Sequence, residues 1–161
     1  MRRSVMCGLV AAATVALLSA ACAKKPEAEP ATGGRDFRES APPSGTSTQP
    51  APGLSTVYFD YDRSEVRSDA GSALKENARV IGEKDWDQVI LEGHCDERGS
   101  EEYNLALGER RANAVRRYLM SLGVPGPRLT TVSYGESRAA KPGHDESAWR
   151  YNRRVDFAIR K

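Results

Sequence analysis

Prolines set the first limit on what this chain can fold into, because most of them fall in one segment. Six of the nine prolines lie between residues 23 and 53, among Ala, Ser, Thr, Gly and charged residues. Such a segment cannot bury enough apolar surface to offset the entropy that it would lose on ordering. We therefore predict a flexible linker up to residue 53 and one globular domain in residues 54–161. A length of about 108 residues is ordinary for a single domain.

The first 22 residues have the pattern of a secretory signal. Arg2 and Arg3 precede an uncharged apolar run at residues 5–18, and small residues then lead to Cys22. The run has about 14 residues, whereas a transmembrane helix needs about 20, so a retained membrane anchor is the weaker interpretation.

Residues 18–22, Leu-Ser-Ala-Ala-Cys, resemble a bacterial lipobox, in which the signal is cut before a cysteine that carries lipid. Ser19 stands where that box usually has Leu, Val or Ile, so ordinary cleavage after residues 19–21 is the alternative. We predict a lipoprotein signal peptide at residues 1–21, and a lipidated Cys22 followed by linker at residues 22–53.

Charge and cysteine content argue against several classes of protein. Without Arg2 and Arg3 the chain has 22 basic and 22 acidic residues, so we expect no nucleic-acid partner. If Cys7 leaves with the signal and Cys22 is lipidated, Cys95 has no partner for a disulfide. The sequence contains no Walker loop, HExxH motif or paired CxxC motif, and we expect no cofactor and no metal.

Apolar periodicity predicts strands and helices in alternation after residue 54. Alternating residues rich in Val, Tyr and Phe are typical of strands, and apolar residues three or four apart are typical of helices. Strands are predicted at residues 54–61, 89–93, 129–134 and 155–160, and helices at residues 68–83, 103–122 and 145–151. This order favours an α+β domain with helices packed on one face of a mixed sheet.

Asp96, Asn104 and Arg111 have a spacing that suits a binding site. Asn104 and Arg111 are seven positions apart, so both lie on one face of the predicted helix, about 10 Å apart along its axis. Helical side chains lean toward the N-terminus, so Arg111 points back toward the loop that contains Asp96. An acid and a base held apart in this way suit a zwitterionic ligand. Spacing alone favours the other interpretation, an internal ion pair between Asp96 and Arg111 that fastens the loop to the helix.

His94 and Cys95 suggest catalysis at first sight, but neighbouring strand residues point to opposite faces, which excludes a Cys–His dyad. A metal site would need three or four converging ligands. We therefore expect a binding module rather than an enzyme, with Cys95 half-buried and His94 hydrogen-bonded. Asp60 and Asp62 either form a turn or line the predicted binding cleft at Asp96, Asn104 and Arg111. Residues 152–154 (Asn-Arg-Arg) are either solvated or support this cleft from behind.

Six motifs in this order resemble the OmpA-like domain family, and specifically its peptidoglycan-associated lipoproteins. They are VYFDYD at 57–62, EGHCDERG at 92–99, EYN at 102–104, LGERRA at 107–112, VSYG at 132–135 and NRR at 152–154. The resemblance implies a βαβαβ-type fold, in which a four-stranded mixed sheet packs against two main helices.

The resemblance also implies that the domain binds meso-diaminopimelate in the stem peptide of peptidoglycan. Asp96 matches the acid that binds the ammonium group, Arg111 the arginine that binds the carboxylate, and Asn104 the helix asparagine. Asp62 and Cys95 match two further pocket positions, although the family usually has Ala or Thr where this chain has Cys95.

At the level of the cell, the resemblance implies an outer-membrane lipoprotein that faces the periplasm, links the outer membrane to the cell wall within the Tol–Pal system and supports cell division. TolB and other Tol proteins are the implied partners. The alternative function is a protein-interaction scaffold with weak peptidoglycan binding. A flagellar stator or a porin with the same domain would need a transmembrane helix or a barrel, which we do not expect in the first 53 residues.

Overall fold

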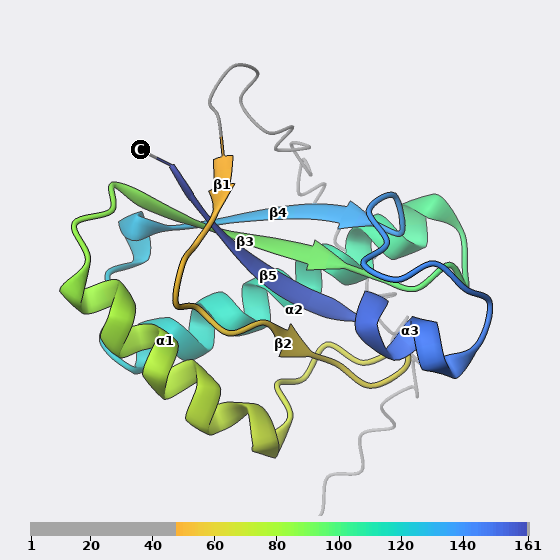
Figure 1. Ribbon diagram of the computed structural model, residues 1–161, viewed down its shortest axis with the longest axis horizontal. Coiled ribbons are helices and arrows are strands. Elements are labelled where there is room, and N and C mark those ends of the chain that lie inside the picture. Colours follow the sequence, from red (N-terminus) through yellow and green to blue (C-terminus); the bar gives the residue numbers. More distant parts are fainter. Residues whose placement is uncertain (1–47, 161) are drawn as a thin grey trace, which may run out of the picture. The chain divides into compact units, whose positions relative to one another are not determined.

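A mixed sheet with helices packed on one face forms the frame of the domain (Figure 1). The computed structural model describes residues 48–160, so the predicted signal peptide, Cys22 and most of the predicted linker lie outside the described residues. The elements in chain order are β1 (Thr48–Pro50), β2 (Val57–Tyr58), the 3-10 helix η1 (Ser68–Ala70), α1 (Gly71–Glu83), β3 (Gln88–His94), α2 (Glu101–Ser121), the 3-10 helix η2 (Gly126–Arg128), β4 (Leu129–Gly135), α3 (Glu146–Asn152) and β5 (Arg154–Arg160).

The strand order is β1-β5-β3-β4, and β2 also pairs with β5. β3 and β4 run parallel, and α2 connects them, because parallel neighbours need a crossover. β5 runs antiparallel to β3, β1 and β2. The predicted α+β class with a mixed sheet is confirmed.

The main core lies between the sheet and the two long helices. Val155, Phe157 and Ile159 of β5 alternate inward and are buried. The same cluster contains Leu74 and Ile81 of α1 and Ala112, Val115 and Leu119 of α2. Leu122, which follows the last residue of α2, is 37% exposed.

The helices begin and end within about two residues of the predicted positions, except that the first turn before α1 is the 3-10 helix η1. Within residues 48–160, none of them is long and apolar enough to cross a membrane.

A local cap and a close crossing fix α2 over the end of β3. The Ser100 side-chain oxygen accepts a hydrogen bond from the Tyr103 N–H at 3.2 Å, which satisfies a donor of the first turn. Further along, a Cβ built on Gly93 of β3 would lie 2.0 Å from the carbonyl oxygen of Gly108 in α2. The two glycines therefore let the first half of α2 lie against the carboxyl end of β3.

The first two strands differ from the prediction. Thr48–Pro50 forms β1, paired with residues 158–160, inside the segment predicted as linker, so the sheet has five strands rather than four. Proline is compatible with this position because β1 lies at the edge of the sheet. β2 covers only Val57–Tyr58 instead of residues 54–61, since the chain turns directly afterwards and Asp62 adopts a left-handed conformation with φ of 54°.

Candidate ligand-binding site

A small cavity lies where the carboxyl end of β3 meets the start of α2. The ends of these two elements are on the right-hand side of Figure 1. The cavity has a volume of about 200 Å³ and is lined by Tyr61, Asp62, Cys95, Asp96, Arg98, Gly99, Tyr103, Asn104, Leu107 and Arg111. These residues come from the turn after β2, the loop after β3 and the first half of α2. The structure thus brings together all five residues that the sequence suggested: Asp62, Cys95, Asp96, Asn104 and Arg111.

Asp96 is a buried carboxylate with four hydrogen bonds from arginines and the backbone. Arg98 donates three of them, from its N–H and Nε to Oδ1 at 3.1 and 3.0 Å and from Nη2 to Oδ2 at 2.7 Å. Arg153 Nη1 donates the fourth to Oδ2 at 3.3 Å. Burial alone would raise the pKa of Asp96, but the hydrogen bonds from Arg98 and Arg153 outweigh it and hold this pKa below its usual value. Asp96 is therefore ionised at neutral pH.

Arg111 is fully buried, and its guanidinium donates to three backbone carbonyls in two chain segments. Nη1 donates to His94 O at 2.8 Å, Nε to Arg63 O at 2.8 Å and Nη2 to Asp60 O at 3.2 Å. Burial lowers the pKa of Arg111, yet a guanidinium keeps its proton in proteins.

The internal ion pair between Asp96 and Arg111, which the spacing allowed, is not formed. The ion pairs of Asp96 within residues 48–160 are with Arg98 at 2.7 Å and with Arg153 at 3.3 Å. Arg111 thus lines the cavity as a cation that has no carboxylate partner in the described part of the chain.

Asn104 and Asp62 have different positions in the cavity. Asn104 is buried, and its Nδ2 donates to Asp96 O at 3.3 Å and to Glu136 Oε2 at 2.6 Å, so it fastens the loop to the helix. Asp62 is exposed at the rim, where its Oδ1 accepts a hydrogen bond from the Tyr103 hydroxyl.

Cys95 and His94 point to opposite sides, as predicted. Cys95 Sγ lies 3.3 Å from both Asn104 O and Arg111 Nη1, and burial raises the pKa of its thiol to about 11, so it stays protonated at neutral pH. His94 stacks instead on Tyr134, with ring centroids 5.5 Å apart. The prediction that His94 is hydrogen-bonded is wrong, because neither ring nitrogen has a partner among the described residues.

Arg98 is the main site residue that sequence reasoning missed. Its guanidinium carbon lies 3.8 Å from the ring centroid of Tyr61 and 4.0 Å from that of Trp149, so it is held between two aromatic rings. The only signal in the sequence is its place two residues after Asp96. Hydrophobic periodicity could not identify Arg98 as a site residue, because it does not predict where the side chain of a loop residue points.

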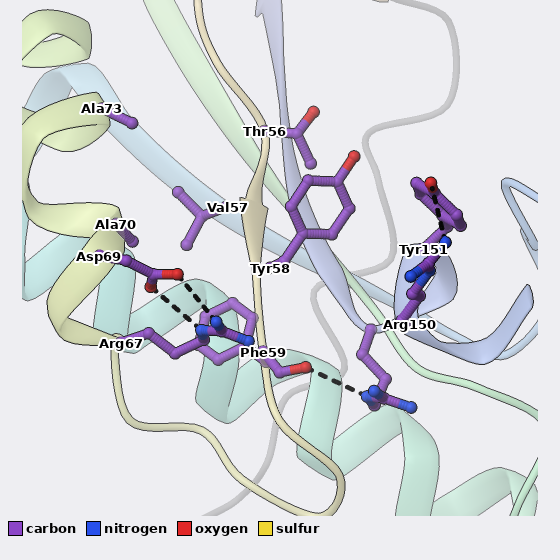
Figure 2. A pocket seen from close by; sticks show the side chains of 11 residues that line it. Thr56, Val57, Tyr58, Phe59, Arg67, Asp69, Ala70, Ala73, Arg150 and Tyr151 are labelled. Atoms are coloured by element: carbon purple, nitrogen blue, oxygen red, sulfur yellow. Dashed lines mark hydrogen bonds and ion pairs between the residues drawn. The ribbon is translucent and has the colours of Figure 1, made fainter. Parts of the chain in front are cut away.

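Arg153 braces the cavity from behind, which decides between the two interpretations of residues 152–154. Its side chain is 7% exposed. Besides its bond to Asp96, its Nε donates to Phe59 O at 3.1 Å, a contact drawn in Figure 2, and it pairs with Glu146.

A larger groove of about 440 Å³ lies beside β2 (Figure 2), and Arg153 is one of its lining residues. Two of its charged side chains pair with each other, Arg67 with Asp69 at 2.8 Å. None of the five sequence-predicted residues lines it. The small cavity is therefore the better candidate site.

The chemistry of the small cavity is recognition of charge. Its lining offers one carboxylate in a buried position, two guanidinium groups and an amide. Within residues 48–160, no group of three or more His, Cys, Asp and Glu side chains could hold a metal ion.

Comparison with known proteins shows the family of the chain. The OmpA family matches residues 58–153. A protein of Pseudomonas aeruginosa named peptidoglycan-associated lipoprotein is 49% identical over 104 residues, which cover 65% of this chain and 61% of the relative. One from Agrobacterium fabrum with the same name is 39% identical over 148 residues, 91% of this chain and 84% of the relative.

Among solved structures, the peptidoglycan-associated lipoprotein from Burkholderia pseudomallei is similar, with 40% identity and a TM-score of 0.62 over 65% of this chain and 88% of that one. The match to the Pseudomonas aeruginosa relative spans only 61% of that protein, and the match to a protein of the same name from Pseudomonas putida spans 62%. The OmpA family nevertheless matches more than half of this chain. The chain therefore belongs to the OmpA family, in the group of the peptidoglycan-associated lipoproteins.

Proposed function

We propose that the domain binds peptidoglycan non-covalently through the side-chain end of meso-diaminopimelate in the stem peptide. The observation that carries this proposal is one small cavity lined by both a buried carboxylate, Asp96, and a buried guanidinium, Arg111. The uncross-linked end of meso-diaminopimelate has an ammonium and a carboxylate, which these two groups complement.

The size of the cavity supports a side chain rather than a saccharide as the bound group. Its volume of about 200 Å³ is below the usual range of pockets for whole small molecules, about 300–1,000 Å³. Two or three charge-assisted hydrogen bonds give modest affinity once the costs of association are subtracted. Many repeated stem peptides in the polymer and a tethered domain raise the effective concentration.

At the level of the cell, we infer an outer-membrane lipoprotein, anchored through lipid on Cys22 and facing the periplasm, that joins the membrane to the cell wall within the Tol–Pal system. The names of the relatives, all peptidoglycan-associated lipoproteins, support the anchor and the ligand. Mass spectrometry of the mature N-terminus tests the anchor: a triacylated Cys22 supports it, and an intact Met1 contradicts it.

Binding to purified sacculi tests the site. Asp96→Asn removes the charge that meets the ammonium and should weaken co-sedimentation about tenfold or more. Asp87→Asn, at an exposed position before β3, is the matched control and should bind like the wild type. In solution, a stem peptide with meso-diaminopimelate should bind more tightly than one with lysine, which lacks the second carboxylate. Equal binding of both peptides would contradict the assignment of the ligand.

TolB is the second proposed ligand of the same face. Tyr61 and Tyr103 at the rim are 55% and 45% exposed, and such aromatic side chains are enriched in protein interfaces. If TolB and peptidoglycan share this rim, adding stem peptide should reduce the TolB captured by the domain. Capture that is unchanged at saturating peptide would place TolB elsewhere.

A further inference from the structure

The carboxylate of Asp96 has no free position for an incoming ammonium group. A carboxylate has about four lone-pair sites. Two donors meet Oδ1, the N–H and Nε of Arg98, and two donors meet Oδ2, Nη2 of Arg98 and Nη1 of Arg153. A ligand that uses Asp96 must therefore replace one of these donors.

Arg98 is the donor that can leave. The Arg153 side chain is 7% exposed and is also fixed by Phe59 O and Glu146, so its departure would leave buried groups unpaired. The Arg98 side chain is 29% exposed, and its guanidinium bonds only to Asp96 in the described part of the chain, with Glu146 Oε2 3.8 Å away.

The surroundings of Arg98 hold a displaced guanidinium close to the site. Its contacts with the rings of Tyr61 and Trp149, at 3.8 and 4.0 Å, do not depend on Asp96, because the face of an aromatic ring attracts a cation by itself. A small movement between the two rings frees one position on each carboxylate oxygen, while the Arg98 N–H stays on Oδ1 and Arg153 stays on Oδ2.

We propose that Arg98 is an internal competitor for Asp96, which the ammonium group of the ligand displaces on binding. This inference rests on the proposed function, since it takes a ligand with an ammonium group at Asp96. It makes Arg98 a specificity-determining residue. A cationic group can replace the guanidinium, whereas a neutral or anionic group would leave Asp96 less well satisfied than it is in the free protein.

Calorimetric titration with a meso-diaminopimelate stem peptide tests the proposal. Arg98→Gln should bind the peptide about three- to tenfold more tightly than the wild type, since the competing ion pair is partly exposed and of modest strength. Arg117→Gln, at an exposed position on α2, is the matched control and should not change the affinity. Equal or weaker binding by Arg98→Gln overturns the proposal, because Arg98 would then position Asp96 or hold the ligand.

Asp96→Asn, made alone and together with Arg98→Gln, separates this inference from the proposed function. If Asp96→Asn leaves binding unchanged in both backgrounds, the proposed function fails. If it weakens binding but Arg98→Gln does not strengthen it, only the role of Arg98 fails.

Nuclear magnetic resonance of the arginine Nε–H groups gives a readout in the unaltered protein. The Arg98 resonance should shift when the stem peptide saturates the site, and it should not shift with a peptide whose side-chain amine is acetylated. The Arg153 resonance, whose Nε bonds to Phe59 O, should shift much less. An Arg98 resonance that stays in place at saturation overturns the proposal even if Arg98→Gln does not fold.

Discussion

The guanidinium of Arg111 joins two chain segments to α2, because it donates to the carbonyls of Asp60, Arg63 and His94. The first two carbonyls belong to the turn after β2, and the third ends β3. This residue therefore organises the walls of the cavity as well as offering a positive charge to it. A buried carbonyl that loses its donor costs about 1–3 kcal/mol.

Arg111→Ala should therefore lower the free energy of unfolding by about 2–4 kcal/mol. Arg111→Lys should recover only part of this loss, since one ammonium cannot replace a planar fork with three separate partners. Urea denaturation measures both, with the exposed Arg117→Ala as a control that should change stability by less than about 0.5 kcal/mol. If Arg111→Ala is as stable as the control, the three carbonyls do not depend on it. A loss of peptidoglycan binding could then be attributed to the missing charge alone.

His94 gives the domain a pH dependence in a defined range. Burial, and then the charge of Arg154, lowers the pKa of His94 from 6.5 to about 4, although Asp156, 3.8 Å away, acts in the other direction. As pH falls below 6.5, the unfolded chain takes up a proton at this residue before the folded domain does. Stability should fall with pH between 6.5 and about 4, by up to about 3 kcal/mol.

His94→Phe keeps a ring that can stack on Tyr134 and removes the titration. Denaturation midpoints at several pH values should fall from pH 6.5 to pH 4.5 in the wild type and stay nearly level in this variant. The pKa of Glu92 is raised by burial, so this residue favours the folded state as pH falls and opposes the trend in both proteins. Parallel curves for wild type and variant would show that His94 is not the titrating group.

At the level of single residues, the sequence predicted the position of a side chain correctly where a helix or strand determines the direction in which that side chain points. The seven-residue spacing on α2 brought Asn104 and Arg111 to one cavity, as predicted. Their partners could not be predicted, because the acceptors of Arg111 are backbone carbonyls of distant segments and Asp96 is held by a loop arginine. Which cation meets which acid depends on loop conformation, which hydrophobic patterning does not encode.

Among the elements, the crossing of β3 and α2 matters most for the site. A Cβ on Gly93 would lie 2.0 Å from the Gly108 carbonyl oxygen, a backbone atom that cannot move without moving the helix. Gly93→Ala should therefore destabilise the domain by about 3 kcal/mol or more, since overpacking against backbone forces the two elements apart. The binding of stem peptide should weaken as well, because α2 holds Asn104 and Arg111.

Gly82 near the end of α1 is the matched control. A Cβ there meets nothing within 4 Å, so Gly82→Ala should stabilise the domain by about 0.5–1 kcal/mol through the helix preference of alanine. Thermal denaturation of both variants is the measurement. If Gly93→Ala melts like the wild type, the close crossing is not a constraint on the fold.

Helices were easier to predict than the first strands, for a physical reason. α1, α2 and α3 bury one stripe each, and a stripe is visible in local sequence. β1 and β2 are short edge strands whose pairing with β5 depends on residues about 100 positions away. The prolines that indicated a linker at residues 50 and 52 are also compatible with an edge, so composition could not separate the two.

For the whole molecule, β1 and β2 together cover the outer edge of β5. β2 pairs with the beginning of β5 and β1 with its end, residues 158–160. The cavity lies near the beginning of β5, since the preceding Arg153 contacts Asp96. The chain thus enters the domain at the end of β5 that is remote from the cavity (Figure 1).

The pairing of β1 with β5 can be removed at one exposed residue. Gln49 is paired with Ile159, and the Ala51 N–H donates to Phe157 O at 2.9 Å. Every second residue pair of an antiparallel ladder is hydrogen-bonded, so the Gln49 N–H also donates to β5. Gln49→Pro deletes this donor and should cost about 1–2 kcal/mol of stability, whereas Gln49→Ser keeps it and should cost little. Hydrogen exchange should become faster at residues 158–160 in the proline variant and stay slow in β3 and β4. Identical exchange and urea midpoints in the two variants would mean that the folded domain starts after β1, near residue 54, where composition alone placed it.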